Sequence, residues 1–379
     1  MSKLFWAVLD DEQKKRTEEI LATFDKDSKD ELGLMSITIA LSNEMFPGTS
    51  VLHTRLRYIY LVVWIFVEVF TNKKWDIKTF HNYEHRLRRS LKAAGEANKK
   101  EYVGILGSIT PNNQDLSQPP FSVYFNLLKE WGIILDDKVQ LSDLYLELID
   151  KKFIEIIEDE KFVIDSFKLS EIEKNEIFKS VPESILKTLF QKDIKIGKEP
   201  FIYFDIDENI SEISSTQKEL FKNAQKFSTL MWGSMIFYNY FLGNQSNEVR
   251  KAFENWKALI VDDKVLENWK PNDTLRIVND KINNQTIHTI RVQFIESWYN
   301  YVIENIKNLS LDNPAGMKDK TLLKFLSDRE SDLKGNRARL LKLEKGEFED
   351  SAKYGLRPIE YRWQNIRRFI EDYKNDITD

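Results

Sequence analysis

The pattern of apolar and polar positions predicts helices along most of the chain. Residues 10–26 are charged and free of glycine, and they carry Ile20, Leu21 and Phe24 on one side, which is typical of an amphipathic helix. The same criteria predict further helices at 36–45, 78–97, 121–131, 141–195, 318–345 and 359–374, and interrupted helices from 215 to 308. Another predicted helix, which Thr49 or Ser50 would cap, carries Arg55 and Arg57 early and the apolar run 58–70 later. Residues that end helices are few, with 13 Gly and 9 Pro in 379 residues.

The longest apolar run, from Tyr58 to Phe70, is predicted to be a buried core helix. It is shorter than the ~20 residues that span a bilayer, and Glu68 interrupts it. The chain starts with a short apolar piece that acidic residues follow at once, unlike a secretory signal. We therefore expect a cytoplasmic protein without a membrane contact.

Two short segments break the helical pattern and indicate β-structure. Residues 133–135 are typical of a short strand after the helix at 121–131, and residues 201–205 are also β-like. A helix followed by a strand is the order found in a winged helix, which reads DNA through a helix in the major groove. The expected fold is all-α or α-dominated α+β, multi-helical, with a small winged-helix-like element near 100–140.

Domain organisation is indicated by a weak break at 197–214. Helical patterns stop before this segment and resume at Ser215. Two domains agree with a length of 379 residues, since a domain typically has roughly 100–200. We predict an N-terminal domain at 1–196 and a C-terminal domain at 197–379.

Composition removes several classes of protein. The chain has no cysteine, which excludes a disulfide scaffold, a thiolate metal site and a cysteine nucleophile. It also lacks a Walker-type phosphate loop and a nucleophile-elbow motif. The net charge of −5 is unlike that of a globally basic nucleic-acid binder, although basic clusters occur locally. We expect no cofactor.

The sharpest chemical pattern is His81-x-x-Glu84-His85, the order of zinc ligands in one class of peptidases. Two histidines four residues apart share one face of a helix and can hold one metal ion, while Glu84 acts on a bound water. Glu155 or Glu158 would supply the third ligand. This pattern supports a metal-dependent hydrolase as an alternative function. The competing interpretation is a solvated helix face that holds no metal.

The C-terminal part of the chain carries arginines interleaved with aromatic residues. This mixture suits phosphate contact and base stacking, and it equally suits ion pairs with acids of the same chain. The predicted anion-binding or nucleic-acid-binding residues in this part are Arg337, Arg339, Arg362, Arg367 and Arg368.

Short stretches near both ends of the chain resemble the signature of an uncharacterised bacterial family, a domain of unknown function. The stretches are Leu32-Gly33-Leu34-Met35-Ser36, Phe46 to Tyr58 with its Pro-Gly-Thr-Ser turn, Val63-Trp64, Gly104 to Gly107, Pro120-Phe121-Ser122 with Tyr124, Trp131-Gly132-Ile133, Arg329-Glu330, Lys334-Gly335, Ala338-Arg339-Leu340 and Tyr361-Arg362-Trp363. Members of this family resemble proteins encoded beside helicases and nucleases in anti-phage loci. The resemblance implies a role in defence and assigns no catalytic residue.

Arg55 and Arg57 belong to this signature and are predicted near the start of a helix. The positive end of the helix dipole disfavours cations there unless an anion pairs with them. That anion could be an internal carboxylate, a phosphate or an acid of a partner. We therefore add both arginines to the predicted anion-binding residues.

These observations favour a non-catalytic subunit of a bacterial anti-phage defence system. We expect it to bind a helicase or nuclease from the same operon, and also DNA. One alternative is the metal-dependent hydrolase described above. The other is a stand-alone DNA-binding regulator that uses residues 118–135.

Overall fold

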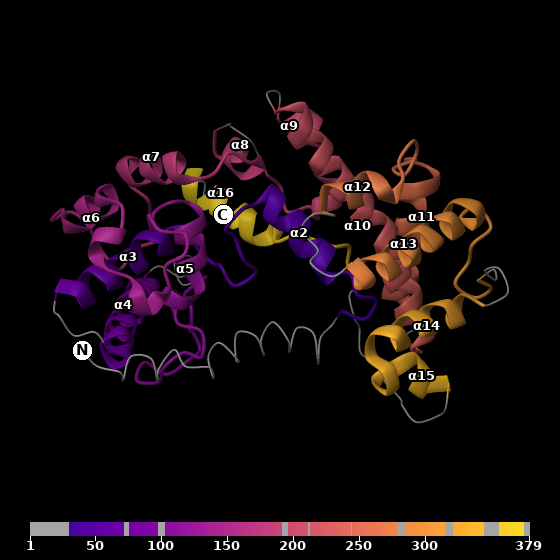
Figure 1. The fold of residues 1–379 in the computed structure, drawn as a ribbon, viewed down its shortest axis with the longest axis horizontal. Helices are drawn as coiled ribbons and strands as arrows, with labels where there is room; N and C mark the ends of the chain where they lie inside the picture. Colours follow the sequence, from indigo (N-terminus) through magenta and orange to yellow (C-terminus); the bar gives the residue numbers. More distant parts are fainter. Residues whose placement is uncertain are drawn as a thin grey trace. The chain divides into compact units, whose positions relative to one another are not determined.

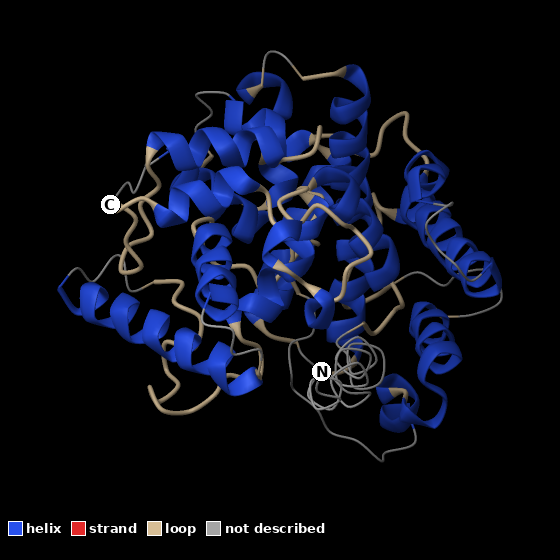
Figure 2. Ribbon diagram, turned by 60° about the vertical axis from the view of Figure 1, so that its left-hand side comes forward, coloured by secondary structure: helices blue, strands red, loops and turns tan. Residues whose placement is uncertain are grey.

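The protein is all-α over the part of the chain that the structure describes. The computed structural model describes residues 30–71, 76–97, 103–191, 196–210, 213–243, 245–278, 285–314, 321–344 and 356–374. These residues form fifteen α-helices and short 3₁₀ turns without a β-strand (Figures 1 and 2). The all-α prediction is thus confirmed. The helix predicted at 10–26 lies outside the described residues.

The chain divides into two compact units. The first unit takes its described residues from the ranges 43–196 and 362–374, and the second from 30–42 and 197–361, apart from the gaps given above. One division lies between residues 196 and 197, where the sequence predicts a domain boundary. Two further divisions fall within the described residues, after residues 42 and 361, and they give each unit a short segment from the opposite part of the chain.

The first unit is organised around α3 (Tyr58–Thr71), the predicted core helix. Twelve of its 14 residues are buried, and α4, α5 and α6 pack against it (Figure 1). A helix that is apolar on all sides must be surrounded in this way. The other helices of this unit are α4 (Ile77–Ala97), α5 (Pro120–Glu130), α6 (Lys151–Glu158), α7 (Glu171–Ser180), α8 (Ile185–Gln191) and α16 (Trp363–Lys374).

The predicted winged-helix-like element is not formed in the described residues. After α5, Gly132 takes a left-handed conformation, and the predicted strand at 133–135 is reduced to one isolated bridge from Ile134 to Ile149. Ile133 and Ile134 are both buried and pack in the core of the unit. In a half-exposed strand, neighbouring side chains would instead alternate between a buried face and an exposed face. The following turns are 3₁₀ helices at Leu141–Asp143 and Leu146–Leu148.

The second predicted strand, at 201–205, is also wrong. Phe201–Tyr203 form a 3₁₀ turn, which places Phe201 and Phe204 on one side, three residues apart. Both rings pack on Phe221, whereas Tyr203 points to solvent. The Gln225 amide donates to the carbonyls of Phe201 and Phe204 and so satisfies the turn without a neighbouring strand.

The second unit is built around α10 (Ser215–Phe241), the longest helix of the described residues. Trp256 and Trp298 pack against it, and their indole N–H groups donate to the α10 carbonyls of Thr229 and Leu230. Gly233 is required in the middle of α10 because a Cβ there would collide with the Trp256 ring. The other helices are α9 (Ile206–Asn209), α11 (Asn247–Val261), α12 (Pro271–Val278), α13 (Gln285–Asn305), α14 (Leu322–Lys334) and α15 (Arg339–Glu344).

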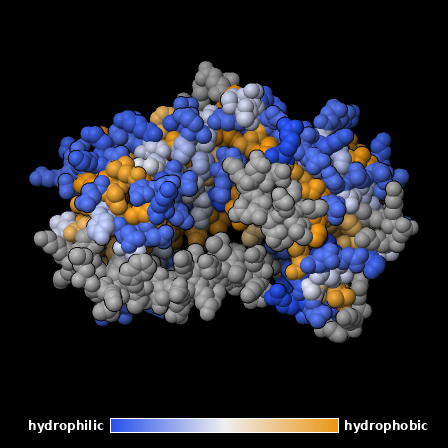
Figure 3. Space-filling view, viewed as in Figure 1, coloured by the Kyte–Doolittle hydropathy of each residue, from blue (hydrophilic) through white to orange (hydrophobic). Residues whose placement is uncertain are grey.

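Helix α2 (Met35–Met45) contains the division after residue 42. Hydrophilic residues cover most of the visible surface of each unit, and apolar residues show between them in smaller groups (Figure 3). Among the helices of the described residues, none has the length and apolar character that a membrane span needs.

Candidate functional site

Arg55 is buried and paired within its own unit. Its Nε and Nη2 lie 2.8–3.0 Å from the carboxylate of Asp372 on α16, and its Nη1 donates to the carbonyl of Val103. The guanidinium also covers the ring of Phe167 at 4.3 Å. Burial raises the pKa of Asp372, although Arg55 and the N–H of Leu56 act in the opposite direction. The anion that Arg55 requires is therefore supplied by the C-terminal helix.

Arg57 is paired in the same manner with a different helix. Its Nε donates to Glu173 at 3.0 Å, and its Nη1 donates to the carbonyl of Ser166. Glu173 also closes a capping box with Ser170 at the start of α7, because each side chain bonds the backbone N–H of the other residue. One carboxylate thus caps a helix and neutralises a buried arginine.

Arg362 lies just before α16 and contacts the Pro-Gly-Thr-Ser turn. Its Nη1 donates to the carbonyl of Thr49, and burial lowers its pKa to about 10. Its backbone has a φ of 68°, which is uncommon for a residue other than glycine. On the next turn, the Asn365 amide donates to the carbonyl of His53. These bonds attach α16 to the segment that leads into α3.

His53 is a buried neutral histidine at this junction. Its Nδ1 accepts from the N–H of Ser50, and its Nε2 lies 3.1 Å from the carbonyl of Val123, which assigns the proton to Nε2. The ring stacks on Tyr124 at 4.4 Å and on Phe369 at 5.9 Å. Burial lowers the pKa of His53 to about 4.

The signature residues of the second unit form a separate buried cluster. Glu31 accepts from Lys334 and, at 2.6 Å, from Arg339. Tyr238 lies with its hydroxyl 3.1 Å from Glu31 and 2.7 Å from Glu330, which also accepts from the N–H of residue 340. Burial, followed by these two carboxylates, raises the pKa of Tyr238. The cluster joins the segment before α2 to α10, α14 and α15.

The predicted anion-binding arginines do not gather in one cleft. Arg55, Arg57, Arg362, Arg367 and Arg368 belong to the first unit, whereas Arg337 and Arg339 belong to the second.

Arg337, Arg367 and Arg368 lie in more exposed or less tightly paired positions than the buried arginines described above. Arg367 is buried beside Gln364 and Glu371, and Arg368 is half-buried on the same helix. Arg337 is exposed in the 3₁₀ turn after α14. Sequence reasoning identified the cations and missed their acidic partners, which lie up to 317 residues away.

The His81-x-x-Glu84-His85 motif lies on α4, with its glutamate turned inward. Glu84 has no exposed side-chain surface, lies 3.2 Å from His81 and is 3.3 Å from Arg88. His85 lies 2.9 Å from the exposed carboxylate of Asp115. In the part of the chain that the structure describes, no three His, Asp or Glu side chains are arranged to hold a metal ion. The side chains of His81, Glu84 and His85 are largely buried, so this part of α4 differs from the solvated helix face of the competing interpretation.

The two residues predicted as a third metal ligand, Glu155 and Glu158, have no ion pair or hydrogen bond with the motif among the described contacts. Glu155 is an exposed residue of α6 and pairs with Lys152 at 2.8 Å. The other candidate, Glu158, is the last residue of the same helix. The metal-dependent hydrolase therefore gains no support from the geometry of these residues.

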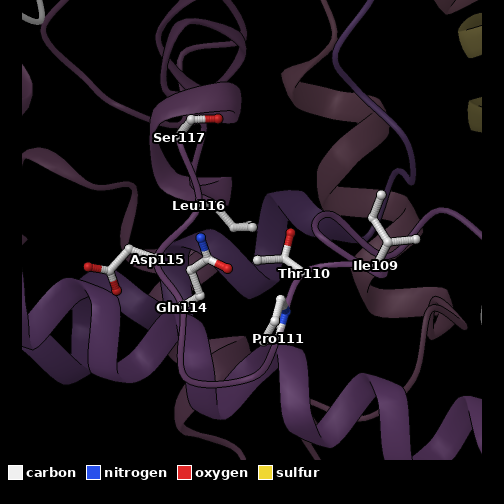
Figure 4. A pocket seen from close by; sticks show the side chains of 7 residues that line it. All are labelled: Ile109, Thr110, Pro111, Gln114, Asp115, Leu116 and Ser117. Atoms are coloured by element: carbon white, nitrogen blue, oxygen red, sulfur yellow. The ribbon is translucent and has the colours of Figure 1, made fainter.

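A hollow of about 410 Å³ lies beside α4, lined by residues 109–111 and 114–117 (Figure 4). Thr110, Gln114 and Leu116 face its middle, while the Asp115 carboxylate points away (Figure 4). Arg88 donates to two carbonyls of this loop, those of Pro111 and Gln114, and Lys92 donates to that of Thr110. Helix α4 therefore holds the loop in place through its basic side chains.

Three further cations of α4 point outward. Lys78, Arg86 and Arg89, here called the outer face of α4, are exposed. Arg86 lies over the Trp64 ring at 5.4 Å. Over the described residues, no carboxylate lies within ion-pair distance of these three side chains. The outer face of α4 is therefore a cluster of cations without a carboxylate partner in the described part of the first unit.

Comparison with known families gives a partial match. Residues 1–138 match the model of a family described as a family of unknown function, DUF6361. The N-terminal signature stretches lie inside this match, and the C-terminal stretches lie outside it. Among curated proteins and among solved structures, nothing matches the chain. Over its first 138 residues the chain is thus similar to a family without an assigned function.

Proposed function

We propose that the protein is a non-catalytic subunit of a bacterial anti-phage defence system that binds a helicase or nuclease partner. The observation that carries the proposal is a set of exposed aliphatic side chains on rigidly held loops of the first unit. Val51 is 61% exposed, Val103 58% and Ile109 97%. Exposed apolar side chains that gather into one patch are typical of sites of protein contact, and in this proposal the three side chains form such a patch.

The loops that carry these side chains are fixed by buried polar groups. Thr54 Oγ1 donates to the carbonyl of Gly104 at 2.6 Å, which joins the loop of Val51 to that of Val103. Arg55 donates to the carbonyl of Val103 itself. Loops that are ordered before binding lose less conformational entropy when a partner docks. The signature arginines therefore support this surface indirectly, by holding it in shape.

The resemblance supplies the class of partner, because similar proteins are encoded beside helicases and nucleases. The buried position of the signature charges also favours an assembly role. Groups such as Asp372, Glu173 and Glu31 bind arginines inside the chain, whereas catalytic groups must reach a substrate.

Affinity capture from a native host tests this proposal. The tagged protein should co-purify with the helicase or nuclease of its operon, and the variant Val51→Asp, Val103→Asp, Ile109→Asp should lose that partner. A matched control is Val163→Asp, Ile172→Asp, which alters two other exposed aliphatic residues of the first unit. Capture without any such partner, or equal capture by both variants, would contradict the proposal.

A further inference from the structure

The outer face of α4 gathers three exposed cations on one helix of the described chain. Several exposed cations of other helices pair with nearby acids, namely Lys152 with Glu155, Lys179 with Glu176, Lys324 with Asp328 and Arg250 with Asp312. Others, such as Lys151, Lys251 and Arg276, are exposed singly without a carboxylate partner among the described residues. Lys78, Arg86 and Arg89 have no such carboxylate among the described residues. The positive charge of this face is thus available to an external anion.

We propose that the outer face of α4 binds the phosphate backbone of double-stranded DNA. The inference rests on the proposed function for its choice of nucleic acid, because a helicase or nuclease partner that acts on phage DNA would bring a DNA duplex to this subunit. Charge complementarity carries it: α4 contains five Lys or Arg against two Glu, in a chain with a net charge of −5. Lys and Arg that neutralise phosphates supply most of the sequence-independent affinity for DNA.

The carboxylate of Glu84, near the middle of α4, does not neutralise the positive charge of the outer face. Glu84 is fully buried and lies 3.3 Å from Arg88, also buried, so this pair is close to neutral and faces the core. Asp115 lies beside His85 at 2.9 Å, on the loop side of the helix. The outward charge of the helix therefore comes from its cations.

The spacing of the three cations suits a polyanion. At 3.6 residues per turn and 1.5 Å per residue, residues 78, 86 and 89 fall within an arc of about 80° and extend over about 16 Å. Duplex DNA carries one negative charge per ~1.7 Å of its axis, so several phosphates lie within reach of such a row. The contact of Arg86 with Trp64 holds one cation of the row in position.

The aromatic residues beside this face favour a duplex over a single strand. Single-stranded nucleic acids bind to exposed aromatic rings on which bases stack. Here Trp64 and Phe80 are 6% and 4% exposed, and the Tyr83 and Trp64 rings meet edge to face. The face therefore offers charge without a stacking platform, which suits contact with the outside of a double helix.

Fluorescence anisotropy with the purified protein and a labelled DNA duplex tests the inference. Because three cations contact phosphates, affinity should fall about 40-fold between 50 and 200 mM salt, with a log–log slope of about −2.7. The variant Lys78→Gln, Arg86→Gln, Arg89→Gln should bind the duplex about tenfold or more weakly at 50 mM salt, and its slope should approach zero. The double variant Lys78→Gln, Arg89→Gln keeps the Arg86–Trp64 contact. Because it removes two of the three cations, the slope of log affinity against log salt concentration should fall by about two-thirds.

The control is Lys152→Gln, Lys179→Gln, Lys324→Gln, which removes three exposed cations that are paired with acids. It changes the net charge equally and should retain the binding of the parent protein. No binding to the duplex at 50 mM salt, equal loss in the control, or tighter binding to a single strand or to duplex RNA would overturn the inference. Since no partner protein is present in this experiment, its outcome is independent of the capture experiment.

Discussion

The first unit contains two groups of arginines that differ in burial and in pairing with carboxylates. Arg55 and Arg57 are buried, and each lies against a carboxylate from a distant helix. Arg86 and Arg89 are exposed on α4 and have no carboxylate at ion-pair distance in the described chain. Removing a charged group from water costs several kcal/mol, so a buried arginine persists only with a partner. The first group is therefore structural, and the second is free to contact another molecule.

The largest effect should follow from removing an acid of the buried group. Asp372→Ala leaves Arg55 and the N–H of Leu56 buried without their acceptor. Breaking a buried pair in this way costs about 3–5 kcal/mol of unfolding free energy. Urea unfolding of the variant, followed by tryptophan fluorescence, measures this loss.

A neighbouring residue supplies the control for that measurement. Glu371→Ala removes a half-exposed carboxylate of the same helix, which lies 4.0 Å from Arg367, and should change stability by less than about 1 kcal/mol. The double variant Arg55→Leu, Asp372→Leu removes both charges and should recover part of the loss. If Asp372→Ala were as mild as Glu371→Ala, the buried pair would not hold α16 in place.

A second large effect should come from pH. The pKa of His53 is lowered from 6.5 to about 4. The folded state therefore binds fewer protons than the unfolded state between these values. Stability is complete above pH 6.5 and falls as the pH decreases to about 4, by up to about 3 kcal/mol. Protonation would also deprive the Ser50 N–H of its acceptor.

His53→Gln provides the comparison for this pH dependence, because glutamine does not titrate. Urea unfolding of both proteins should give free energies that differ most at pH 7.5 and converge toward pH 4. Curves that stay parallel over this range would show that His53 does not titrate as a buried neutral base.

Helix positions could be predicted from the sequence, because apolar spacing and a scarcity of glycine are local signals. The predictions at 36–45 and 78–97 correspond to α2 and α4, with ends that differ by one residue or coincide. Helix α3 contains the predicted apolar run, but it begins at Tyr58, after Arg55 and Arg57 and well after the cap expected at Thr49 or Ser50. The two predicted strands failed for a tertiary reason. Ile133 and Ile134 are buried together, and the turn at Phe201–Tyr203 is completed by a side chain of α10.

The partners of the signature arginines could not be predicted in the same way. The position of Arg55 at a helix start indicates that an anion is needed, but the chain has 61 Asp and Glu residues. Nothing local distinguishes Asp372 from its neighbour Glu371, since both lie on an amphipathic helix. Only the fold determines that residue 372 faces inward, 317 positions after its partner.

A smaller loss of unfolding free energy is expected from a substitution at Gly48, in the turn that precedes Arg55. Gly48 has a φ of 73°, and a Cβ there would lie 2.9 Å from Glu130 Cβ and 3.0 Å from Trp131 Nε1. Gly48→Ala should therefore cost about 2 kcal/mol, from the left-handed backbone together with steric crowding. Gly132→Ala is the matched control, because Gly132 has a φ of 65° and open space around it. Its loss in urea unfolding should be about 1 kcal/mol, and an equal loss at both sites would exclude the steric contribution.

The smallest effect on stability is expected for the exposed arginines of α4. Arg89→Ala removes a solvated cation without an ion-pair partner in the described chain, so it should change the unfolding free energy by less than about 0.5 kcal/mol. Arg57→Ala makes the same chemical change in the buried group and leaves Glu173 without its cation, at a cost of about 3 kcal/mol or more. A stability loss above about 1 kcal/mol for Arg89→Ala would give the outer face of α4 a structural role, in conflict with the division drawn here. An unchanged stability combined with weaker, less salt-dependent DNA binding would separate the two groups of arginines by both criteria.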